Sequence, residues 1–260
     1  TVFGCSFSDT SCRLIISGLV FRYVSCPLFW ETKLGVVMLA VRLENVSKVY
    51  RADKIETIAL ENINLQVLEG EFVSIMGPSG CGKSTLLNII GLLDSPSQGR
   101  VFLQEQALEK ESGTRQAHFR NKTLGFVFQS FQLIQSLNVE DNIGLPLLYR
   151  KIGAQERKER INRVIERVGL THRRKHFPAQ LSGGQCQRVA VARALVGSPA
   201  IILADEPTGN LDTQMGTEIM NLLLELNETE KCTIVMVTHN EEQAHKTQRI
   251  IRILDGRQIA

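Results

Sequence analysis

The segment from residue 77 to residue 85 limits the possible folds of this chain more than any other feature. It has the pattern G-x-x-x-x-G-K-[ST], and a short apolar run, residues 72–76, comes directly before it. Such glycines let backbone N–H groups point inward at phosphate oxygens, and a helix expected over residues 83–91 adds its positive N-terminal end. The segment therefore predicts a phosphate-binding loop between a strand and a helix. Its members are Gly77, Pro78, Ser79, Gly80, Cys81, Gly82, Lys83, Ser84 and Thr85.

Length and composition leave room for one nucleotide-binding unit. The chain has 260 residues, 43% of them apolar and 22% charged. The net charge of +3 is too small to indicate nucleic acid. No stretch approaches the roughly 20 uninterrupted apolar residues of a membrane-spanning helix, so the chain itself is not a channel. The six cysteines lack metal-ligand spacing, which favours a reducing compartment.

Residues 1–37 differ in character from the rest of the chain. They hold three of the six cysteines and the only tryptophan, without clear strand or helix periodicity. Their apolar pieces are short and a basic n-region is missing, so a signal peptide or anchor fits poorly. We expect Met38 to be the natural start and residues 1–37 to be an atypical leader outside the core domain. An interfacial or partner-binding arm is the alternative.

From Met38 onward, strand-like and helix-like segments alternate, which is typical of a parallel sheet with helices on its faces. Helical spacing of apolar residues predicts helices within residues 138–178 and again around residues 219–226. An Asp255-Gly256 turn near the end predicts a hairpin. The expected strands are residues 41–46, 72–76, 124–128, 201–204, 233–237 and 249–254.

The polar residues at the ends of these strands suit phosphoryl chemistry. Lys83 would reach the β- and γ-phosphates, Ser84 would ligate Mg²⁺, and Thr85 follows on the phosphate-facing turn. Asp205 and Glu206 follow a buried strand, where open α/β sheets bind their ligands. Asp205 would hold Mg²⁺ and Glu206 would act as general base or orient the attacking water. Two solvated acids at a strand end are the alternative.

A second phosphate-binding helix end is expected at residues 181–185, Leu-Ser-Gly-Gly-Gln. A helix over residues 185–195 would let Ser182 and the N–H groups of Gly183 and Gly184 form an anion site together with Gln185. The sequence therefore predicts a second helix end that can bind an anion, in addition to the phosphate loop.

This order of motifs resembles the ATPase subunit of ATP-binding-cassette (ABC) transporters, from about Val41 to Ala260. The resemblance implies an α/β fold: a P-loop NTPase (RecA-like) core with a mainly parallel sheet, an N-terminal antiparallel β subdomain and an inserted α-helical subdomain. An ABC ATPase domain over residues 38–260 would contain that helical subdomain at about residues 138–198. The implied ligands are ATP and Mg²⁺, and the implied assembly is a homodimer in the ATP-bound state.

The resemblance also assigns roles to residues outside the phosphate loop. Gln129 matches the glutamine whose amide approaches Mg²⁺, and His239 matches the histidine that contacts the γ-phosphate and the attacking water. Tyr50 matches the aromatic residue that stacks on adenine, although an ordinary strand-end tyrosine is the alternative. Asp212 matches a residue that crosses the dimer interface. Residues 182–185 would act in trans on the partner's ATP.

Residues 131–134, 142–149 and 178–180 look most like the lipoprotein-releasing and macrolide-exporter branch of the family. That branch implies separate membrane permease subunits, no nucleic acid, and a peripheral position on the cytoplasmic face of the cell membrane. An ATPase that regulates cell-wall remodelling in cell division through a membrane partner, without transport, is the alternative. A DNA-repair or translation ATPase would carry tandem cassettes, zinc modules or a coiled coil, and the sequence has none. The basic run 172–176 is interpreted as a solvated loop, with binding to lipid phosphates or an acidic partner as the other possibility.

Overall fold

The computed structural model describes residues 13–16, 19–22, 38–52, 55–108 and 111–259. The chain divides into two units, Thr1–Val37 and Met38–Ala260. In the first unit, β1 (Arg13–Ile16) pairs antiparallel with β2 (Leu19–Arg22). The expected role of residues 1–37 as a leader concerns mostly residues outside the described ones and stays a prediction.

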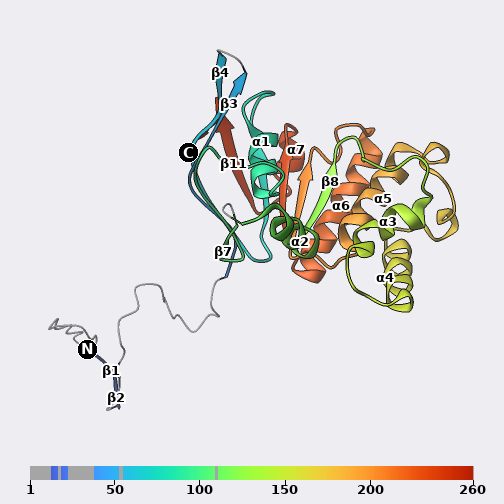
Figure 1. Ribbon diagram of the computed structural model, residues 1–260, viewed down its shortest axis with the longest axis horizontal. Helices are drawn as coiled ribbons and strands as arrows, with labels where there is room; N and C mark the ends of the chain where they lie inside the picture. Colours follow the sequence, from blue (N-terminus) through green and yellow to red (C-terminus); the bar gives the residue numbers. More distant parts are fainter. Residues whose placement is uncertain (1–12, 17–18, 23–37, 53–54, 109–110, 260) are drawn as a thin grey trace. The chain divides into compact units, whose positions relative to one another are not determined.

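A six-stranded sheet of order β12-β11-β5-β10-β9-β8 forms the centre of the second unit (Figure 1). All neighbouring strands in it run parallel except the antiparallel pair β11 and β12. Because β10 lies between β5 and β9, strand ends that are distant in sequence meet at one edge. The strands are β5 (Phe72–Met76), β8 (Leu124–Phe128), β9 (Ile201–Asp205), β10 (Thr233–Thr238), β11 (Arg249–Leu254) and β12 (Arg257–Ile259).

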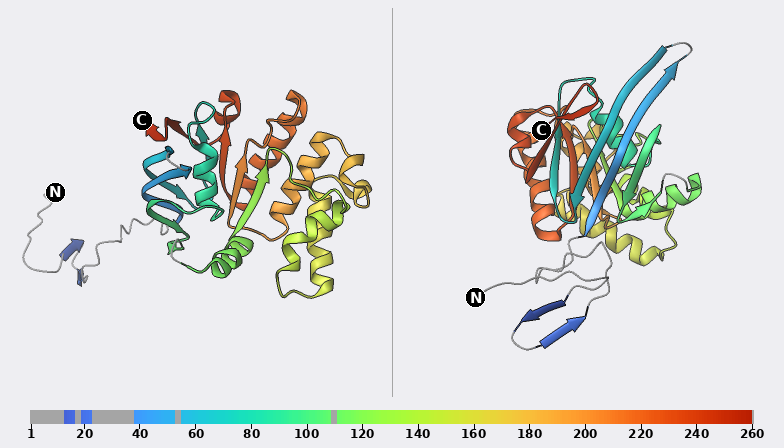
Figure 2. Two further views of the ribbon diagram at one scale, coloured as in Figure 1. Left: turned by 45° about the horizontal axis from the view of Figure 1, so that its top comes forward. Right: turned by 90° about the vertical axis from the view of Figure 1, so that its left-hand side faces the viewer.

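A second, antiparallel sheet has the order β4-β3-β6-β7. Its long hairpin extends well beyond the other strands (Figure 2). The strand expected over residues 41–46 is part of the longer β3, because pairing with β4 continues to Ala52. The strands are β3 (Leu39–Ala52), β4 (Ile55–Leu68), β6 (Gln98–Leu103) and β7 (Gln106–Ala107).

Helices cover both faces of the parallel sheet. Helix α1 lies between the two sheets, whereas α3, α4 and α5 gather at the opposite end of the unit (Figure 2). Two 3₁₀ turns, Thr171–Arg173 and Pro178–Gln180, connect α4 to α5. The helices are α1 (Lys83–Ile90), α2 (Gly113–Thr123), α3 (Val139–Leu148), α4 (Ala154–Arg167), α5 (Gly183–Leu195), α6 (Thr213–Glu230) and α7 (Glu241–Ala244).

Alternate residues of the central strands pack into two separate cores. On β10, Val235 and Val237 join the cluster that contains the buried side chains of α1 and β4. Ile234 and Met236 point the other way, into the cluster formed with α3, α5 and α6. Burial on both faces explains why these strands are uniformly apolar in sequence. The predicted α/β architecture, a mainly parallel sheet with an N-terminal antiparallel β subdomain, is confirmed.

The basic run is tied to the start of α3. Glu140 accepts from Arg174 at 3.2 Å and lies 2.9 Å from Lys175 Nζ, and the backbone N–H of Val139 donates to the carbonyl of His176. Burial alone would raise the pKa of Glu140, but these two cations outweigh it and lower that pKa. The run therefore holds the start of α3 in place, and its residues 172, 173 and 175 are exposed to solvent. In the part of the chain that the structure describes, no helix is long and apolar enough to cross a membrane.

Candidate nucleotide site

The loop between β5 and α1 has the backbone of a phosphate cradle. Gly80 and Gly82 adopt φ angles of 80° and 100°, which favour glycine. A Cβ at Gly82 would lie 2.3 Å from the Ala59 carbonyl oxygen, and one at Gly77 would lie 2.1 Å from that of Ile253. The loop can therefore hold this course only with glycine at these positions.

Lys83 begins α1 and folds back over the loop. Its Nζ donates to the carbonyl oxygens of Gly77 at 2.8 Å and Pro78 at 2.7 Å, and the residue is only 6% exposed. The thiol of Cys81 lies 3.9 Å from the same Nζ and packs into the core. The charge of Lys83 is thus held at the loop, where phosphate oxygens could replace the carbonyls as acceptors.

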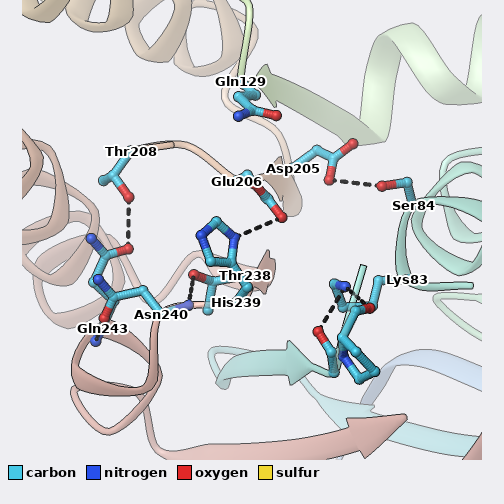
Figure 3. Close-up of polar contacts among 12 residues, drawn as sticks. Lys83, Ser84, Gln129, Asp205, Glu206, Thr208, Thr238, His239, Asn240 and Gln243 are labelled. Atoms are coloured by element: carbon cyan, nitrogen blue, oxygen red, sulfur yellow. Dashed lines mark hydrogen bonds and ion pairs between the residues drawn. The ribbon is translucent and has the colours of Figure 1, made fainter. Parts of the chain in front are cut away.

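Ser84 and Asp205 join the phosphate loop to the end of β9. Ser84 Oγ donates to Asp205 Oδ1 at 3.2 Å (Figure 3). Burial raises the pKa of the Asp205 carboxyl and the neighbouring Glu206 adds to the rise, although Ser84 and Lys83 oppose it. Asp205 is partly buried, and its carboxylate forms no ion pair among the described residues. A hydroxyl and a carboxylate on facing elements are ligands that suit Mg²⁺ when phosphate oxygens and water complete the shell, so the residues present fit that ion.

Glu206 and His239 form a pair at the ends of adjacent strands. His239 Nδ1 lies 3.0 Å from Glu206 Oε1, and both side chains face the space beside Asp205 (Figure 3). Glu206 has a φ angle of 44°, rare for a residue with a side chain, and its N–H donates to the Val237 carbonyl. Left-handed backbone of this kind redirects the carboxylate from the strand toward the site. The geometry places a carboxylate and an imidazole where a water molecule could lose a proton.

Gln129 follows β8 and lies against the loop after β9. Its Nε2 donates to Asn210 Oδ1 at 3.3 Å, and Asn210 Nδ2 donates to the Gln129 carbonyl at 3.0 Å. A Cβ at Gly209 would lie 2.6 Å from Nε2, so the glycine makes room for the amide. With the nitrogen engaged, the amide oxygen lies on the side of Asp205 (Figure 3). Sequence reasoning missed Asn210, because no local pattern signals a contact between residues so far apart in the chain.

Residues 181–185 form the N terminus of α5. The helix begins at Gly183, two residues earlier than expected, because Ser182 and Gln185 form a capping box. Ser182 Oγ accepts from the Gln185 N–H at 3.3 Å, and Gln185 Oε1 accepts from the Ser182 N–H at 3.0 Å. The pattern S-x-x-Q was the signal for this earlier start. Neither residue forms a hydrogen bond to the phosphate loop within the described part of the chain.

Two other predicted residues lie at the edges of this site. Tyr50 is on β3, with its side chain 43% exposed and its hydroxyl donating to Asp94 at 2.9 Å. Asp212 caps α6 by accepting from the Met215 N–H at 2.9 Å. Thr85 lies in the first turn of α1 and is partly exposed. A glycine-lined phosphate loop facing paired carboxylates across a parallel sheet defines the class of P-loop nucleotide-binding proteins.

Comparison with known proteins identifies the family within this class. The sequence pattern of the family described as ABC transporter matches residues 60–209. The chain is 49% identical to the uncharacterized ABC transporter ATP-binding protein MJ1508 of Methanocaldococcus jannaschii, over 83% of this chain and 96% of that protein. It is 43% identical to the lipoprotein-releasing system ATP-binding protein LolD of Pseudoalteromonas translucida, over 84% and 94% respectively.

A solved structure is similar over nearly its whole length. The ATP-binding cassette MJ0796, also of M. jannaschii, in a dimeric post-hydrolysis state bound to ADP and Pi, matches with a TM-score of 0.78 and 46% identity. The match covers 84% of this chain and 97% of that one. The chain belongs to the ATP-binding proteins of the ABC transporter family, and it is an ATP hydrolase.

Proposed function

We propose that this chain powers an exporter or a lipoprotein-release system by hydrolysing ATP within an ATP-bridged homodimer. The observation that carries the proposal is that the N terminus of α5, the second helix end expected to bind phosphate, forms no hydrogen bond with the phosphate loop among the described residues. The phosphate loop leads into α1, and Ser182 opens α5, but the hydrogen bonds of Ser182 and Gln185 among described residues stay within their own cap. A second copy turned head to tail would bring its Ser182 to the ATP on the first copy's loop. The dimeric state of MJ0796 supports this arrangement.

Each residue of the site then has a step in hydrolysis. Lys83 exchanges its loop carbonyls for β- and γ-phosphate oxygens. Ser84 and Asp205 would hold Mg²⁺, with the Gln129 amide oxygen nearby, and the bound ion would supply positive charge to the phosphates. Glu206, oriented by His239, accepts the proton of the attacking water. The left-handed backbone at Glu206 keeps that carboxylate aimed at the site.

A cavity of about 720 Å³ between α2, β8 and α3 is the proposed docking site for the permease. Apolar side chains line it, including Phe126, Phe128 and Leu145, with Tyr149 at its rim. The lining contains the guanidinium groups of Arg120, Arg150 and Arg193 and no carboxylate. Burial lowers the pKa of Arg150 and Arg193, and the nearby charge of Arg160 adds to the effect on Arg150. Both guanidinium groups donate to backbone carbonyls. An amphipathic permease segment with an acidic residue would satisfy both features.

This cavity lies next to the segment that follows Gln129. Arg193 donates to the carbonyl oxygens of Phe131 and Gln132, both of which have left-handed backbone. If the Gln129 side chain moves when the bound nucleotide changes, the movement would therefore be transmitted to the cavity through the Phe131–Gln132 turn, which Arg193 holds in place. A permease seated there would couple to hydrolysis, and the chain would lie on the cytoplasmic face of the cell membrane through that permease. The similarity to LolD supports the lipoprotein-release branch.

Affinity purification from detergent-solubilised membranes tests the permease partner. The Tyr149→Glu variant should lose a copurifying multispanning membrane protein, because Tyr149 lines the cavity and is 80% exposed. Leu148→Glu is the matched control, since Leu148 is 59% exposed but outside the cavity lining. Equal retention of the partner by both variants would contradict docking at this cavity. Recovery of a division-associated membrane protein in place of a transport permease would instead support the cell-wall regulator.

A further inference from the structure

An ion-paired cluster holds the exposed ring of Tyr50 in place. The Tyr50 hydroxyl donates to Asp94 Oδ2 at 2.9 Å. Asp94 is itself held, since its Oδ1 accepts from Lys48 Nζ at 2.6 Å and from the Ser95 N–H at 2.7 Å. Lys48 Nζ also donates to the Ser95 carbonyl at 2.8 Å. The anchor of the Tyr50 hydroxyl is therefore a carboxylate that Lys48 and the Ser95 backbone hold in turn.

The Lys48 charge is largely removed from water, and the Asp94 charge is partly so. The Lys48 side chain is 12% exposed and that of Asp94 is 30% exposed. Burial by itself would raise the pKa of Asp94, but hydrogen bonds from Lys48, Tyr50 and Ser95 outweigh it and lower that pKa. Asp94 therefore stays ionised at neutral pH, and an ionised acceptor makes a stronger bond to the Tyr50 hydroxyl than a neutral one.

The two faces of the Tyr50 ring are not equivalent. Lys48 Nζ lies 4.9 Å from the ring centroid and occupies one face as a cation–π partner. The residue remains 43% exposed, which leaves ring surface away from Lys48 for a flat partner. Aromatic rings of nucleobases stack on such a face with little regard to base identity.

The cluster of Lys48, Tyr50 and Asp94 lies near the phosphate loop, because the two contact paired strands of the same hairpin. Lys48 on β3 pairs with Leu60 on β4. The Leu60 side chain and the Ala59 carbonyl pack so closely on Gly82 that a Cβ there would lie 2.8 Å and 2.3 Å from them. Asp94 follows α1, the helix that the same loop begins. The ring and the phosphate loop thus share one side of the antiparallel sheet.

We propose that Asp94 and Lys48 are positioning residues that hold the Tyr50 ring for the base of the bound nucleotide, with the base on the ring face opposite Lys48. This inference rests on the proposed nucleotide site. It adds the set of contacts that orders the ring before the nucleotide arrives. The base then binds to a ring that has already lost its conformational freedom, which improves affinity for the base but not for the phosphates.

The test compares MgATP with Mg-tripolyphosphate, which has the phosphates but no base. Binding of each is measured by isothermal titration calorimetry, and the steady-state hydrolysis of ATP is measured in parallel. Tyr50→Ala should weaken MgATP binding about 5- to 150-fold, the range expected for one stacked base, and leave tripolyphosphate binding unchanged. Tyr50→Phe, which removes the orienting bond, and Asp94→Asn, which replaces its ionised acceptor with a neutral amide, should each weaken MgATP binding about 3- to 10-fold, again without effect on tripolyphosphate.

Combined variants and controls distinguish positioning from general damage. The Tyr50→Phe/Asp94→Asn double variant should be no weaker than the weaker single variant, because both act on the same contact. In each, KM for ATP should rise while kcat stays constant, as for an interaction made equally in the ground and transition states. Glu56→Gln, which breaks the exposed Arg51–Glu56 ion pair on the same hairpin, should bind both ligands like the unaltered chain.

Three outcomes would overturn the inference. The first is an unchanged affinity of Tyr50→Phe for MgATP. The second is a loss of affinity in Asp94→Asn that is equal for MgATP and Mg-tripolyphosphate. The third is tighter MgATP binding by either variant, because the hydroxyl–carboxylate contact would then compete with the base. Tyr50→Phe retains the ring, so it remains informative if Asp94→Asn fails to fold. Lys83→Ala should weaken both ligands. If it weakens neither, the proposed nucleotide site itself is wrong.

Discussion

Replacing Glu206 with Gln should separate ATP binding from hydrolysis. Glu206 Oε1 lies 3.0 Å from His239 Nδ1, and the Glu206 N–H is bound to the Val237 carbonyl. Glutamine has the same length and keeps an oxygen that can accept from His239, but it cannot take up a proton from water. The fold and the affinity for Mg-ATP should therefore persist while the chemical step slows.

The structure allows the size of this effect to be estimated. Loss of a positioned general base costs about 10²- to 10⁴-fold, equivalent to roughly 3–5 kcal/mol on the barrier. The Glu206 side chain is 21% exposed, so bulk water can take up part of the proton-acceptor role. We therefore expect a fall of about 10²- to 10³-fold, in the lower half of that range. Single-turnover hydrolysis with radiolabelled ATP measures it directly.

Unhydrolysed ATP should then keep two copies of the Glu206→Gln variant together. Each ATP would bridge Lys83 of one copy to Ser182 of the other, so the variant should be a dimer in ATP and a monomer without it. Adding Ser182→Arg should abolish dimerisation and leave ATP binding by the single chain largely intact. Size-exclusion chromatography with light scattering measures the mass, and a fluorescent ATP analogue measures binding.

A matched control separates the dimer contact from damage to the helix. Ser182→Arg also removes the N-cap of α5, which costs about 1 kcal/mol. Asn138→Arg removes the equivalent N-cap of α3, where Asn138 Oδ1 accepts from the Asp141 N–H at 2.9 Å. This control in the Glu206→Gln background should still dimerise. A Glu206→Gln chain that binds ATP but stays monomeric at high concentration would refute the bridged dimer.

Other variants probe the metal site, the Gln129 contact and the leader. Asp205→Asn should raise the melting temperature of the nucleotide-free protein at pH 7, because the folded-state pKa of Asp205 lies above its ordinary 3.8 and ionisation destabilises the fold. That gain should shrink as pH falls through the folded-state pKa and vanish below about 3.8; a gain independent of pH, measured by differential scanning calorimetry, would be inconsistent with it. Gly209→Ala should slow hydrolysis about 10- to 100-fold by displacing Gln129. Gly216→Ala, whose added Cβ would lie 3.5 Å from its nearest neighbour, should hydrolyse ATP normally in the same phosphate-release assay. A chain shortened to begin at Met38 should keep full ATPase activity, and a several-fold loss would show that the leader contributes.

Local parts of the fold and site could be predicted from the sequence because short-range chemistry specifies them. The glycines at 77 and 82 are required by close backbone approach, and the apolar runs of β5 and β10 match strands buried on both faces. The start of α5 was predicted two residues late, although the capping box at Ser182 and Gln185 was present in the sequence. The expected range followed the helical spacing of residues 185–195, whereas the cap formed by Ser182 and Gln185 sets the first turn of the helix. Each of these features depends on residues a few positions apart.

The phosphate loop, the buried strands and the carboxylates that follow one of them are therefore specified by local sequence. Which side chains meet depends on the packing of distant elements: Ser84 meets Asp205, Gln129 meets Asn210, and Tyr50 meets Asp94. The order of strands along the chain does not reveal that β10 lies between β5 and β9, the position that places His239 beside Glu206. These contacts depend on how the sheet and helices pack, since burial of apolar faces selects the strand order and the polar residues at the strand ends are carried with it.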